Sequence, residues 1–561
     1  MRPHRTKPDE TRFAGITLAG IRFTGITRAE ITHKRIPPKA IATAALILLA
    51  QLYAVAQPPA KTPGNTNTGT NNDDIAERIV GAALTRGGAI SFLETLTDTI
   101  GGRVTGSPES HATSELILKE LRAAGFDNAH FEEFPLESAW QRGPASGWVA
   151  SPIKRPLYIG SYGWAPGTNG RVEVPLVTVV ATPDGMFSAD AAKKAGKKKE
   201  DAAKLDPAKL RGAAVLVTLE STASANTFAA NYVVLRSRTA RQLAAAGAVA
   251  MLIPSEKPDR MLYTSAAGLY PRAPLPILSV AKEDTLFLLR LLAKGEVKIG
   301  LDIQNSFIDH PANDHPADRR IADRPSTERN VIADIPGSSP NAVVLLGAHF
   351  DSWDPAQGAD DNGSGVAMVL EAARILKSLN VKPKATIRFA FFSGEEQACL
   401  GSRAYADAHK TELDHLWAAL ITDNGALMPT GFSLHGRDDL RAPLQRELTA
   451  LQPLGAATIV TEGDLYSDDE TFVVEGVPAL SLEVAASDYD NRHHTIIDTF
   501  DKIDPRSLSL DTAVLALAFY EIAASDHPPG RRFSPREVDT LLKKTGQADY
   551  VDLDFKRSPQ P

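Results

Sequence analysis

The sequence predicts an α/β protein built on a buried, mostly parallel sheet, and two kinds of segment carry that prediction. AVVLLGAHF and TIRFAFFSG are apolar runs that each end in a turn of small residues, as buried strands do. Between them, VAMVLEAARILKSL has the spacing of a helix that crosses back over a sheet. A strand, a crossover helix and a second strand are therefore expected in succession between residues 342 and 394.

Length and composition predict more than one domain. The chain has 561 residues, too many for one ordinary core, and its 43% hydrophobic content is typical of globular proteins. The net charge is −7 without a dominant basic stripe, which argues against nucleic-acid binding. The single cysteine, Cys399, excludes an intramolecular disulfide.

The N-terminal region has the pattern of an export signal. Basic residues precede the apolar run IATAALILLAQLYAVAQ, which contains Ala-Val-Ala before a glutamine. We expect residues 1–56 to be an N-terminal extension and signal peptide, cleaved after Ala56, in a secreted or periplasmic protein. The run is short for a membrane span, so retention as an anchor is the less favoured alternative. Residues 57–73, rich in Pro, Gly and Asn, predict a disordered linker.

Folded structure is expected from Asp74 onward. DIAERIVGAALTRG and ESHATSELILKELRAAGF have helical spacing, and HFEEFPLE has that of a strand. Short β-branched segments such as VEVPLVTVV and AAVLVTL follow, and they predict a compact β-rich second domain with few helices. The expected boundaries are residues 74–156 and 328–527 for the main domain, 157–308 for the second domain, 309–327 for a low-complexity insertion and 528–561 for a C-terminal tail.

Residues with the chemistry of metal ligands follow the expected strands of the main domain. They are His349 in GAHFDSWD, Asp361 in GADDNGSG, the pair Glu395-Glu396 in FFSGEEQ, Asp423 in LITDNGA and His494 in NRHHTIIDT. Each motif alone is ordinary, but candidate ligands at consecutive strand ends form a functional pattern, because sites in open α/β sheets lie there. Carboxylates and imidazoles without thiolates suit two zinc-like ions that activate water, so the pattern predicts a hydrolase.

The spacing of these residues suggests further roles. Glu395 and Glu396 are adjacent, and successive side chains diverge on extended or turning backbone. One of them is therefore expected to bind metal and the other to act as general base. Asp351, two residues after His349, is placed to orient the imidazole, and Asp498 is expected to do the same for His494. His493 suits either a solvent-facing neighbour or a substrate contact.

The ordered set resembles the M28 peptidases, co-catalytic zinc exopeptidases, and within them the plasma glutamate carboxypeptidase, or carboxypeptidase Q, branch. HFDSWDPAQGADDNGSG, EEQACLGSRAYADAHK, NGALMPTGF and HHTIIDTFDKIDP carry the resemblance, with DTIGGRVTGSPES upstream. It extends roughly from Asp74 to His527. The resemblance implies a three-layer α/β/α sandwich with a mixed, mostly parallel sheet, and it implies that the second domain is an inserted protease-associated domain.

The resemblance also assigns the site residues. It implies two Zn²⁺ ions per chain bridged by Asp361, with His349 and Asp423 completing one site, Glu396 and His494 completing the other, and Glu395 as the catalytic base. It implies a cis peptide bond between Asp361 and Asn362 as well. One position departs from the branch, because Asp360 precedes the bridging residue here. A shift of one residue would make Asp360 the ligand, but the alignment of DNGSG favours Asp361.

The activity implied is that of a zinc-dependent metallopeptidase acting on dipeptides or short peptides, with a homodimer as the expected assembly. An aminopeptidase is favoured, and a carboxypeptidase-like dipeptidase is the alternative. Glutaminyl cyclases and non-catalytic, receptor-like binding proteins are rival classes. The presence of both His349 and Asp423, which a second ion needs, argues against them.

Overall fold

The computed structural model describes residues 70–182, 185–188, 207–219, 225–268, 272–308, 326–463, 465–485, 489–548 and 551. The predicted signal peptide, most of the predicted linker and low-complexity insertion, and the end of the tail lie outside the described residues, and the first described helix begins at Thr70, before the predicted start at Asp74. Within the described residues, α13 (Pro505–Ala524) is the helix whose length and composition would suit a membrane span. Most of that helix is buried inside the protein, as core helices are.

The first sheet contains, among the described residues, eight strands in the order β1-β13-β15-β14-β16-β19-β17-β18. Its centre is parallel, since β14 pairs in parallel with β15 and β16, and β16 with β19, while β1 and β13 are antiparallel. The strands are β1 (His130–Leu136), β13 (Ser326–Ile335), β14 (Val343–His349), β15 (Thr386–Phe392), β16 (Leu416–Ile421), β17 (Pro429–Ser433), β18 (Thr458–Val460) and β19 (Ala479–Val484).

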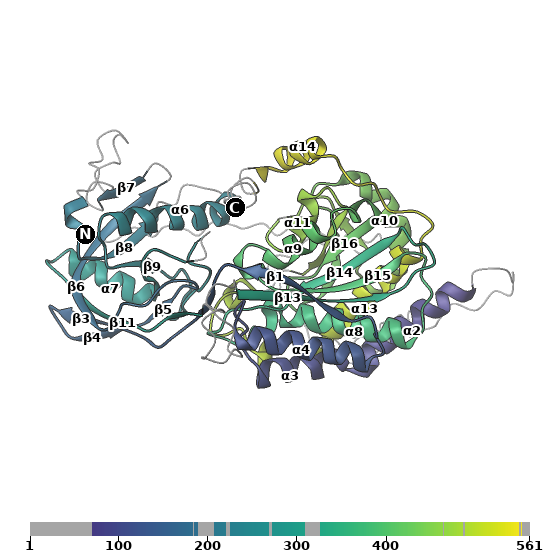
Figure 1. Cartoon of the computed structure of the whole chain (residues 1–561), viewed down its shortest axis with the longest axis horizontal. Coiled ribbons are helices and arrows are strands. Elements are labelled where there is room, and N and C mark those ends of the chain that lie inside the picture. Colours follow the sequence, from purple (N-terminus) through teal and green to yellow (C-terminus); the bar gives the residue numbers. More distant parts are fainter. Residues whose placement is uncertain are drawn as a thin grey trace, which may run out of the picture. The chain divides into compact units, whose positions relative to one another are not determined.

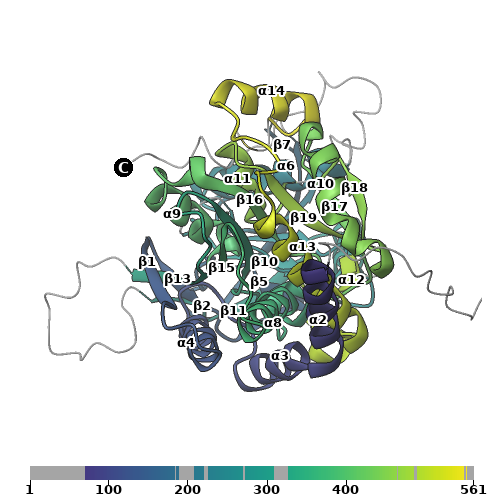
Figure 2. The same cartoon turned by 90° about the vertical axis from the view of Figure 1, so that its right-hand side faces the viewer.

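Helices cover both faces of this sheet (Figures 1 and 2). One face carries α8 (Ser364–Ser378) and α13, with α2 (Thr70–Arg86), α3 (Gly88–Thr99) and α4 (Pro108–Ala123) beside them. The other face carries α9 (Leu400–Ala408), α11 (Asp469–Val474) and α14 (Pro535–Thr545), whereas α10 (Arg441–Glu447) and α12 (Tyr489–Arg492) lie in the connections. The layers confirm the predicted α/β/α sandwich.

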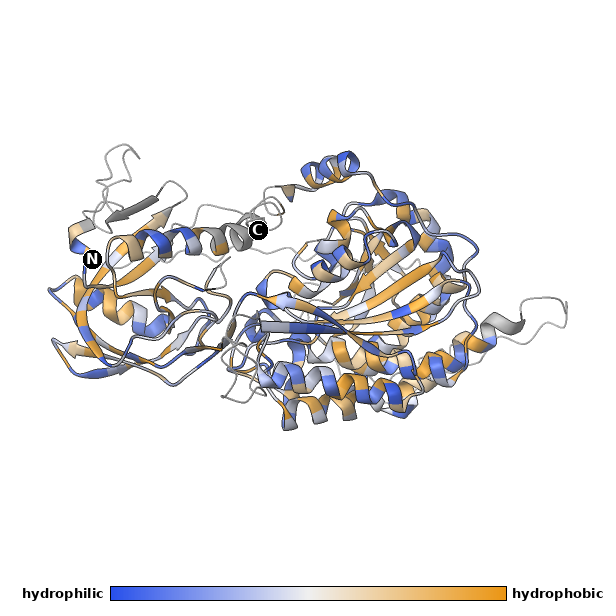
Figure 3. Ribbon diagram, in the orientation of Figure 1, coloured by the Kyte–Doolittle hydropathy of each residue, from blue (hydrophilic) through white to orange (hydrophobic). Residues whose placement is uncertain are grey.

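The central strands are apolar because both of their faces are buried. Val344 and Leu346 of β14 pack into the core beneath α8 and α13, while Leu345 packs into the core under α9 and α11. Successive side chains of a strand point to opposite faces, so a strand covered on both sides becomes a continuous apolar run. Figure 3 shows this run as orange strands in the middle of the sheet.

Polar caps fix where two of the helices begin. The side chain of Ser107 accepts a hydrogen bond from the first turn of α4, and Asp504 does the same for α13. In both helices a proline follows the cap, Pro108 and Pro505 respectively. Proline suits this position because its fixed φ matches the helix and its missing N–H would have no partner there.

The second domain, residues 145–303, forms a nine-stranded sheet among the described residues, in the order β4-β3-β11-β6-β8-β9-β10-β5 with β7 beside β6. Its strands are β3 (Ala145–Ser151), β4 (Arg155–Leu157), β5 (Ile159–Ser161), β6 (Val172–Thr182), β7 (Gly185–Ser188), β8 (Ala214–Leu219), β9 (Ala250–Pro254), β10 (Ile277–Val280) and β11 (Lys298–Ile303), with helices α6 (Ala225–Ala245) and α7 (Lys282–Leu292). The segments just before and just after this domain pair with each other as two antiparallel strands, β2 (Ala139–Gln141) and β12 (Ser306–Ile308). The predicted β-rich region is confirmed, although β3 precedes the predicted start at residue 157.

Candidate metal centre

The predicted ligands gather at the carboxyl edge of the first sheet. His349 is the last residue of β14, the short helix Glu395–Gln397 follows β15, and Asp423 follows β16. Because these strands are parallel neighbours, their carboxyl ends meet, and the side chains beyond them converge. His494 reaches the same place from the loop that follows β19 and α12.

One group of ligands forms around His349. Its Nε2 atom lies 3.2 Å from Oδ1 of Asp423 and 3.5 Å from Oδ1 of Asp361. The ligand atoms of these residues all lie within 4.8 Å of one another, close enough to share one ion. His349 is fully buried, and Asp361 nearly so.

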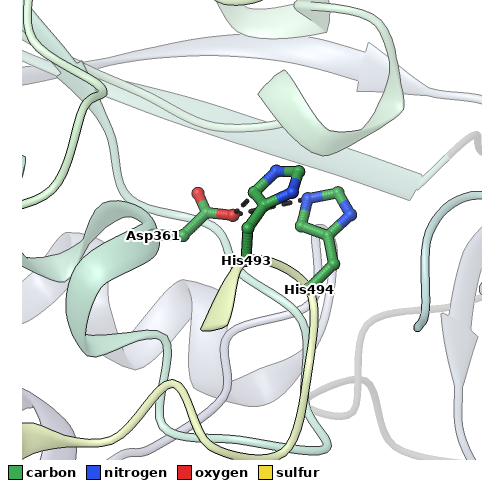
Figure 4. A group of neighbouring side chains, drawn as sticks. All are labelled: Asp361, His493 and His494. Atoms are coloured by element: carbon green, nitrogen blue, oxygen red, sulfur yellow. Dashed lines mark ion pairs between the residues drawn. The ribbon is translucent and has the colours of Figure 1, made fainter. Parts of the chain in front are cut away.

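A second group forms on the other side of Asp361. Nε2 of His494 lies 3.3 Å from Oδ2 of Asp361 and 3.1 Å from Oε2 of Glu396. Figure 4 shows the carboxylate of Asp361 pointing toward the imidazoles of His493 and His494. The two oxygens of Asp361 thus face two different histidines, which is the arrangement that a bridging carboxylate needs.

Several buried atoms in this cluster suit a cation. Among the described residues, Nε2 of His349, Oδ1 of Asp423 and Oε1 of Glu396 are buried without a hydrogen-bond partner. A buried polar atom without a partner is costly, and a metal ion would supply the missing partner. Imidazole and carboxylate donors are those that catalytic zinc prefers, so the donor set fits zinc.

The electrostatics of the cluster also favour a cation. Burial raises the pKa of Glu396 to about 7, although His494 lowers it. Burial likewise raises the pKa of Glu395 well above its usual range, and nearby Asp423 adds to the effect. Burial is the main cause of both shifts and the neighbouring carboxylates add to it, so a divalent cation among them would favour the ionised forms.

Glu395 lies beside the predicted ligands, but it is farther from His349 than Asp361 and Asp423 are. Its Oε2 is 3.9 Å from Nε2 of His349, compared with 3.2 Å for Asp423 and 3.5 Å for Asp361. Its side chain is only 12% exposed. This position next to the ligand atoms, shielded from bulk water, suits a general base.

Asp351 connects His349 with the glutamate pair. Its Oδ1 lies 3.5 Å from Nδ1 of His349 and accepts from the backbone N–H of Glu395 at 3.3 Å. Its Oδ2 accepts from the backbone N–H of Glu396 at 3.3 Å and from the hydroxyl of Thr105 at 2.7 Å. The carboxylate is therefore placed to orient the imidazole and the turn that presents the two glutamates, as the sequence spacing suggested.

The structure distinguishes Asp361 from its neighbour Asp360. Asp360 turns toward Arg492, whose Nη2 lies 3.0 Å from Oδ2, and its Oδ1 accepts from the backbone of Ala426 at 3.1 Å. Of these two aspartates, Asp361 is the one that lies between His349 and His494. The peptide bond between Asp361 and Asn362 is cis, as the resemblance implied.

The prediction that Asp498 orients the imidazole of His494 is wrong. Its carboxylate accepts from the backbone N–H groups of Asp360 at 2.6 Å and Asp361 at 3.2 Å, so it holds the turn that carries Asp361. Nδ1 of His494 instead faces the carbonyl oxygen of Thr264, at 3.0 Å. The turn after His494 directs Asp498 toward the backbone of Asp360 and Asp361. The short separation of Asp498 and His494 in the sequence does not indicate this direction.

Two residues near the site were missed from the sequence. Trp353 donates from Nε1 to Oε2 of Glu396 at 2.5 Å, and its place in the HFDSWD motif was the available signal. Thr264 acts through its backbone carbonyl, for which a sequence offers no signal. His493 stacks on His494 with ring centres 3.8 Å apart, and its Nε2 lies 3.7 Å from Asp361. The ligand atoms of Asp361, His493 and His494 lie within 4.8 Å of one another, so His493 is a further candidate ligand, whereas His494 lies beside Glu396 as well.

Comparisons with known proteins match this chain to a peptidase family. The sequence profile of peptidase family M28 matches residues 330–518. Carboxypeptidase Q of Mus musculus is 27% identical over 466 residues, covering 81% of this chain and 90% of the relative, and that of Bos taurus is 28% identical over 462 residues, covering 80% and 89%.

Solved structures match over a similar length. A peptidase M28 precursor from Shewanella amazonensis SB2B superposes with a TM-score of 0.68 at 27% identity, covering 82% of this chain and 99% of that one. An aminopeptidase from Aneurinibacillus sp. strain AM-1 has a TM-score of 0.57 at 20% identity, covering 82% and 98%, and this likeness shows the fold alone.

Proposed function

Since this chain belongs to peptidase family M28 and is a zinc metallopeptidase, we propose that it is a di-zinc exopeptidase acting on dipeptides or short peptides. The observation that carries the proposal is the placement of Asp361 between His349 and His494, one carboxylate oxygen toward each, at 3.5 and 3.3 Å. Asp423 beside the first histidine and Glu396 beside the second complete two ligand sets.

Each residue has a distinct part in the proposed reaction. Zinc held by these ligands would supply a Lewis acid that polarises the scissile carbonyl and lowers the pKa of water. Glu395 takes the proton from the attacking water and passes it to the leaving amine. Burial raises the pKa of Glu395, and a cation nearby would lower it again, toward the range in which the side chain is ionised and free to accept a proton. Asp351 holds the turn that presents this group.

Paired glutamate variants test these roles. Glu395→Gln keeps the shape of the side chain and removes the proton acceptor, so turnover should fall by about 10² to 10⁴ while zinc content stays unchanged. Glu396→Gln removes a charged ligand, so zinc affinity should fall and added zinc should restore part of the activity. Zinc content and turnover are measured together for both variants. Zinc loss in Glu395→Gln with retention in Glu396→Gln would reverse the assignment, and unchanged turnover in both would refute the role of the pair.

We favour aminopeptidase action within this proposal. A two-metal centre with an open coordination position would be able to take the α-amino group of the substrate as a ligand beside the scissile carbonyl, which favours peptides with a free amino terminus. The name of the relative carboxypeptidase Q supports the alternative, a carboxypeptidase-like dipeptidase. Peptides with free, N-acetylated and C-amidated ends distinguish the two. Hydrolysis should require the free amino terminus, and equal cleavage of blocked peptides would refute exopeptidase action.

Export, the protease-associated nature of the second domain and a homodimer complete the proposal. The apolar run that ends at Ala56 supports an exported mature protein beginning at Gln57. N-terminal sequencing of the protein recovered from the periplasm or medium tests this, and an uncleaved protein in the membrane fraction would favour the anchor alternative. Light scattering coupled to gel filtration tests the dimer.

A further inference from the structure

The two proposed metal sites differ in which part of the chain supports their ligands. Nδ1 of His349 lies 3.1 Å from the backbone carbonyl of Asp351, and the carboxylate of Asp351 accepts from Thr105. All of these residues belong to the domain of the first sheet. The backbone of Glu396 also binds Asp351, but the side-chain contacts of Glu396 and His494 continue through Trp353 and Thr264 to the second domain, residues 145–303.

The first connection runs through Thr264, which lies in the second domain. Its carbonyl oxygen is 3.0 Å from Nδ1 of His494, and its backbone N–H donates to the carbonyl of His494 at 2.9 Å. A carbonyl only accepts, so Nδ1 carries the proton and Nε2 is left with its lone pair toward Asp361 and Glu396. The ring of Tyr263 packs beside the imidazole, with centres 5.3 Å apart.

The second connection runs through Trp353. Its Nε1 donates to Oε2 of Glu396, and its ring packs edge-on against Trp164 of the second domain, with centres 6.1 Å apart. Gly163 lies directly against the same indole. A Cβ atom at Gly163 would stand 2.3 Å from the ring of Trp353, a distance that no side chain tolerates without movement.

The two connections belong to one hydrogen-bonded unit. The backbone N–H of Gly163 donates to Ser265 at 2.9 Å, and the backbone N–H of Ala267 donates to Gly163 at 2.8 Å. Gly163 and Trp164 are therefore tied to the segment that presents Tyr263 and Thr264. A displacement of this unit would reach Glu396 and His494 together and leave the partners of His349 in place.

We propose that the second domain is a structural part of the metal centre, in which Thr264 and Trp353 are positioning residues for His494 and Glu396. The ion held by this pair should therefore depend on the contact with the second domain, and the ion held by His349 and Asp423 should not. This inference rests on the proposed function, because it assumes two zinc sites.

Zinc titration of the full chain tests the inference. The metal-free protein is titrated with Zn²⁺ against a chromogenic chelator, and the Co²⁺-loaded protein gives a visible spectrum that reports ligand geometry. Glu396→Gln and Asp423→Asn identify which binding step belongs to which site. Trp353→Phe keeps a ring and removes the donor, and Gly163→Ala pushes the indole away. Gly81→Ala is the control, because a Cβ there meets nothing within 4 Å.

Trp353→Phe and Gly163→Ala should each weaken by about 10- to 100-fold the step that Glu396→Gln weakens, and change the corresponding Co²⁺ band. The other step and the Gly81→Ala control should be unchanged. Equal weakening of both steps, or of neither, would overturn the inference. If Gly163→Ala fails to fold, Tyr263→Leu decides the matter, because it removes the ring of the second domain that packs beside His494. A wild-type chain that binds fewer than two ions would overturn the proposed function itself, whereas two ions with unaffected variants would overturn this inference alone.

Discussion

Replacing Arg103 by methionine should destabilise the protein strongly, although Arg103 is not a predicted ligand. Its side chain is fully buried and donates hydrogen bonds of 2.7 to 2.8 Å to the backbone carbonyl oxygens of Gly101, Phe350, Gln357 and Gly358. The carbonyl of Phe350 belongs to the segment after β14, those of Gln357 and Gly358 belong to the segment before Asp361, and that of Gly101 lies in the turn that carries Arg103 itself. Arg103 therefore clamps together the two turns that carry His349 and Asp361.

The expected loss of stability depends on two opposing contributions, the hydrogen bonds that Arg103 makes and the cost of burying its charge. A hydrogen bond from a charged donor contributes about 1.5–3 kcal/mol, but the terms do not add fully, and burying the charge costs part of the gain. That cost is visible in Arg103, because burial lowers its pKa to about 10 although Asp498 and Asp351 raise it. Each carbonyl left buried without a donor costs about 1–3 kcal/mol, so losing several donors at once, offset by the charge that no longer has to be buried, should cost about 3–5 kcal/mol in Arg103→Met.

Urea unfolding followed by circular dichroism measures this loss, and zinc affinity measured in parallel should fall because both ligand-bearing turns loosen. Arg171→Met is the matched control, since Arg171 is 64% exposed and pairs with Glu173 on the surface. It should change the free energy of unfolding by at most about 1 kcal/mol. Equal shifts of the unfolding midpoint in the two variants would refute the reasoning about the clamp.

Three further predictions concern the site and its surroundings. Asp351→Asn should lower kcat/KM by about 10- to 100-fold with the fold intact, because an amide N–H₂ would face the backbone donors of Glu395 and Glu396; unchanged kinetics would contradict this. Chelation of zinc should lower the melting temperature, and zinc should restore it, since buried ligand atoms then lose their partner; an unchanged temperature in calorimetry would exclude a stabilising ion. His409 lies 2.9 Å from Glu132, and this hydrogen bond raises the pKa of His409. The stabilisation is complete below about pH 6.5 and is lost as the pH rises through the raised pKa, so His409→Gln should cost up to about 1 kcal/mol at pH 6 and less at pH 9, by urea unfolding at both values.

The central part of the fold could be predicted because its strands are buried on both faces. Such strands leave continuous apolar runs, and β14 and β15 were predicted from those runs. The short edge strand β18 and the pair of β2 with β12 leave no such pattern, since each has only three residues. Their positions depend on tertiary contacts, which sequence periodicity does not record.

The site shows the same limit at the level of single residues. Asp351 was predicted to support His349 because the two are neighbours on one strand end, where local geometry decides what can touch. Thr264 lies 230 residues from His494 and acts through its carbonyl, so neither its distance along the chain nor its side chain suggests the contact. The nearby Asp498 was chosen for that role and binds the backbone at Asp361 instead. The residue types that can bind a metal are visible in the sequence, so the ligands can be predicted. The groups that orient those ligands depend on the tertiary structure, and they include backbone atoms as well as side chains.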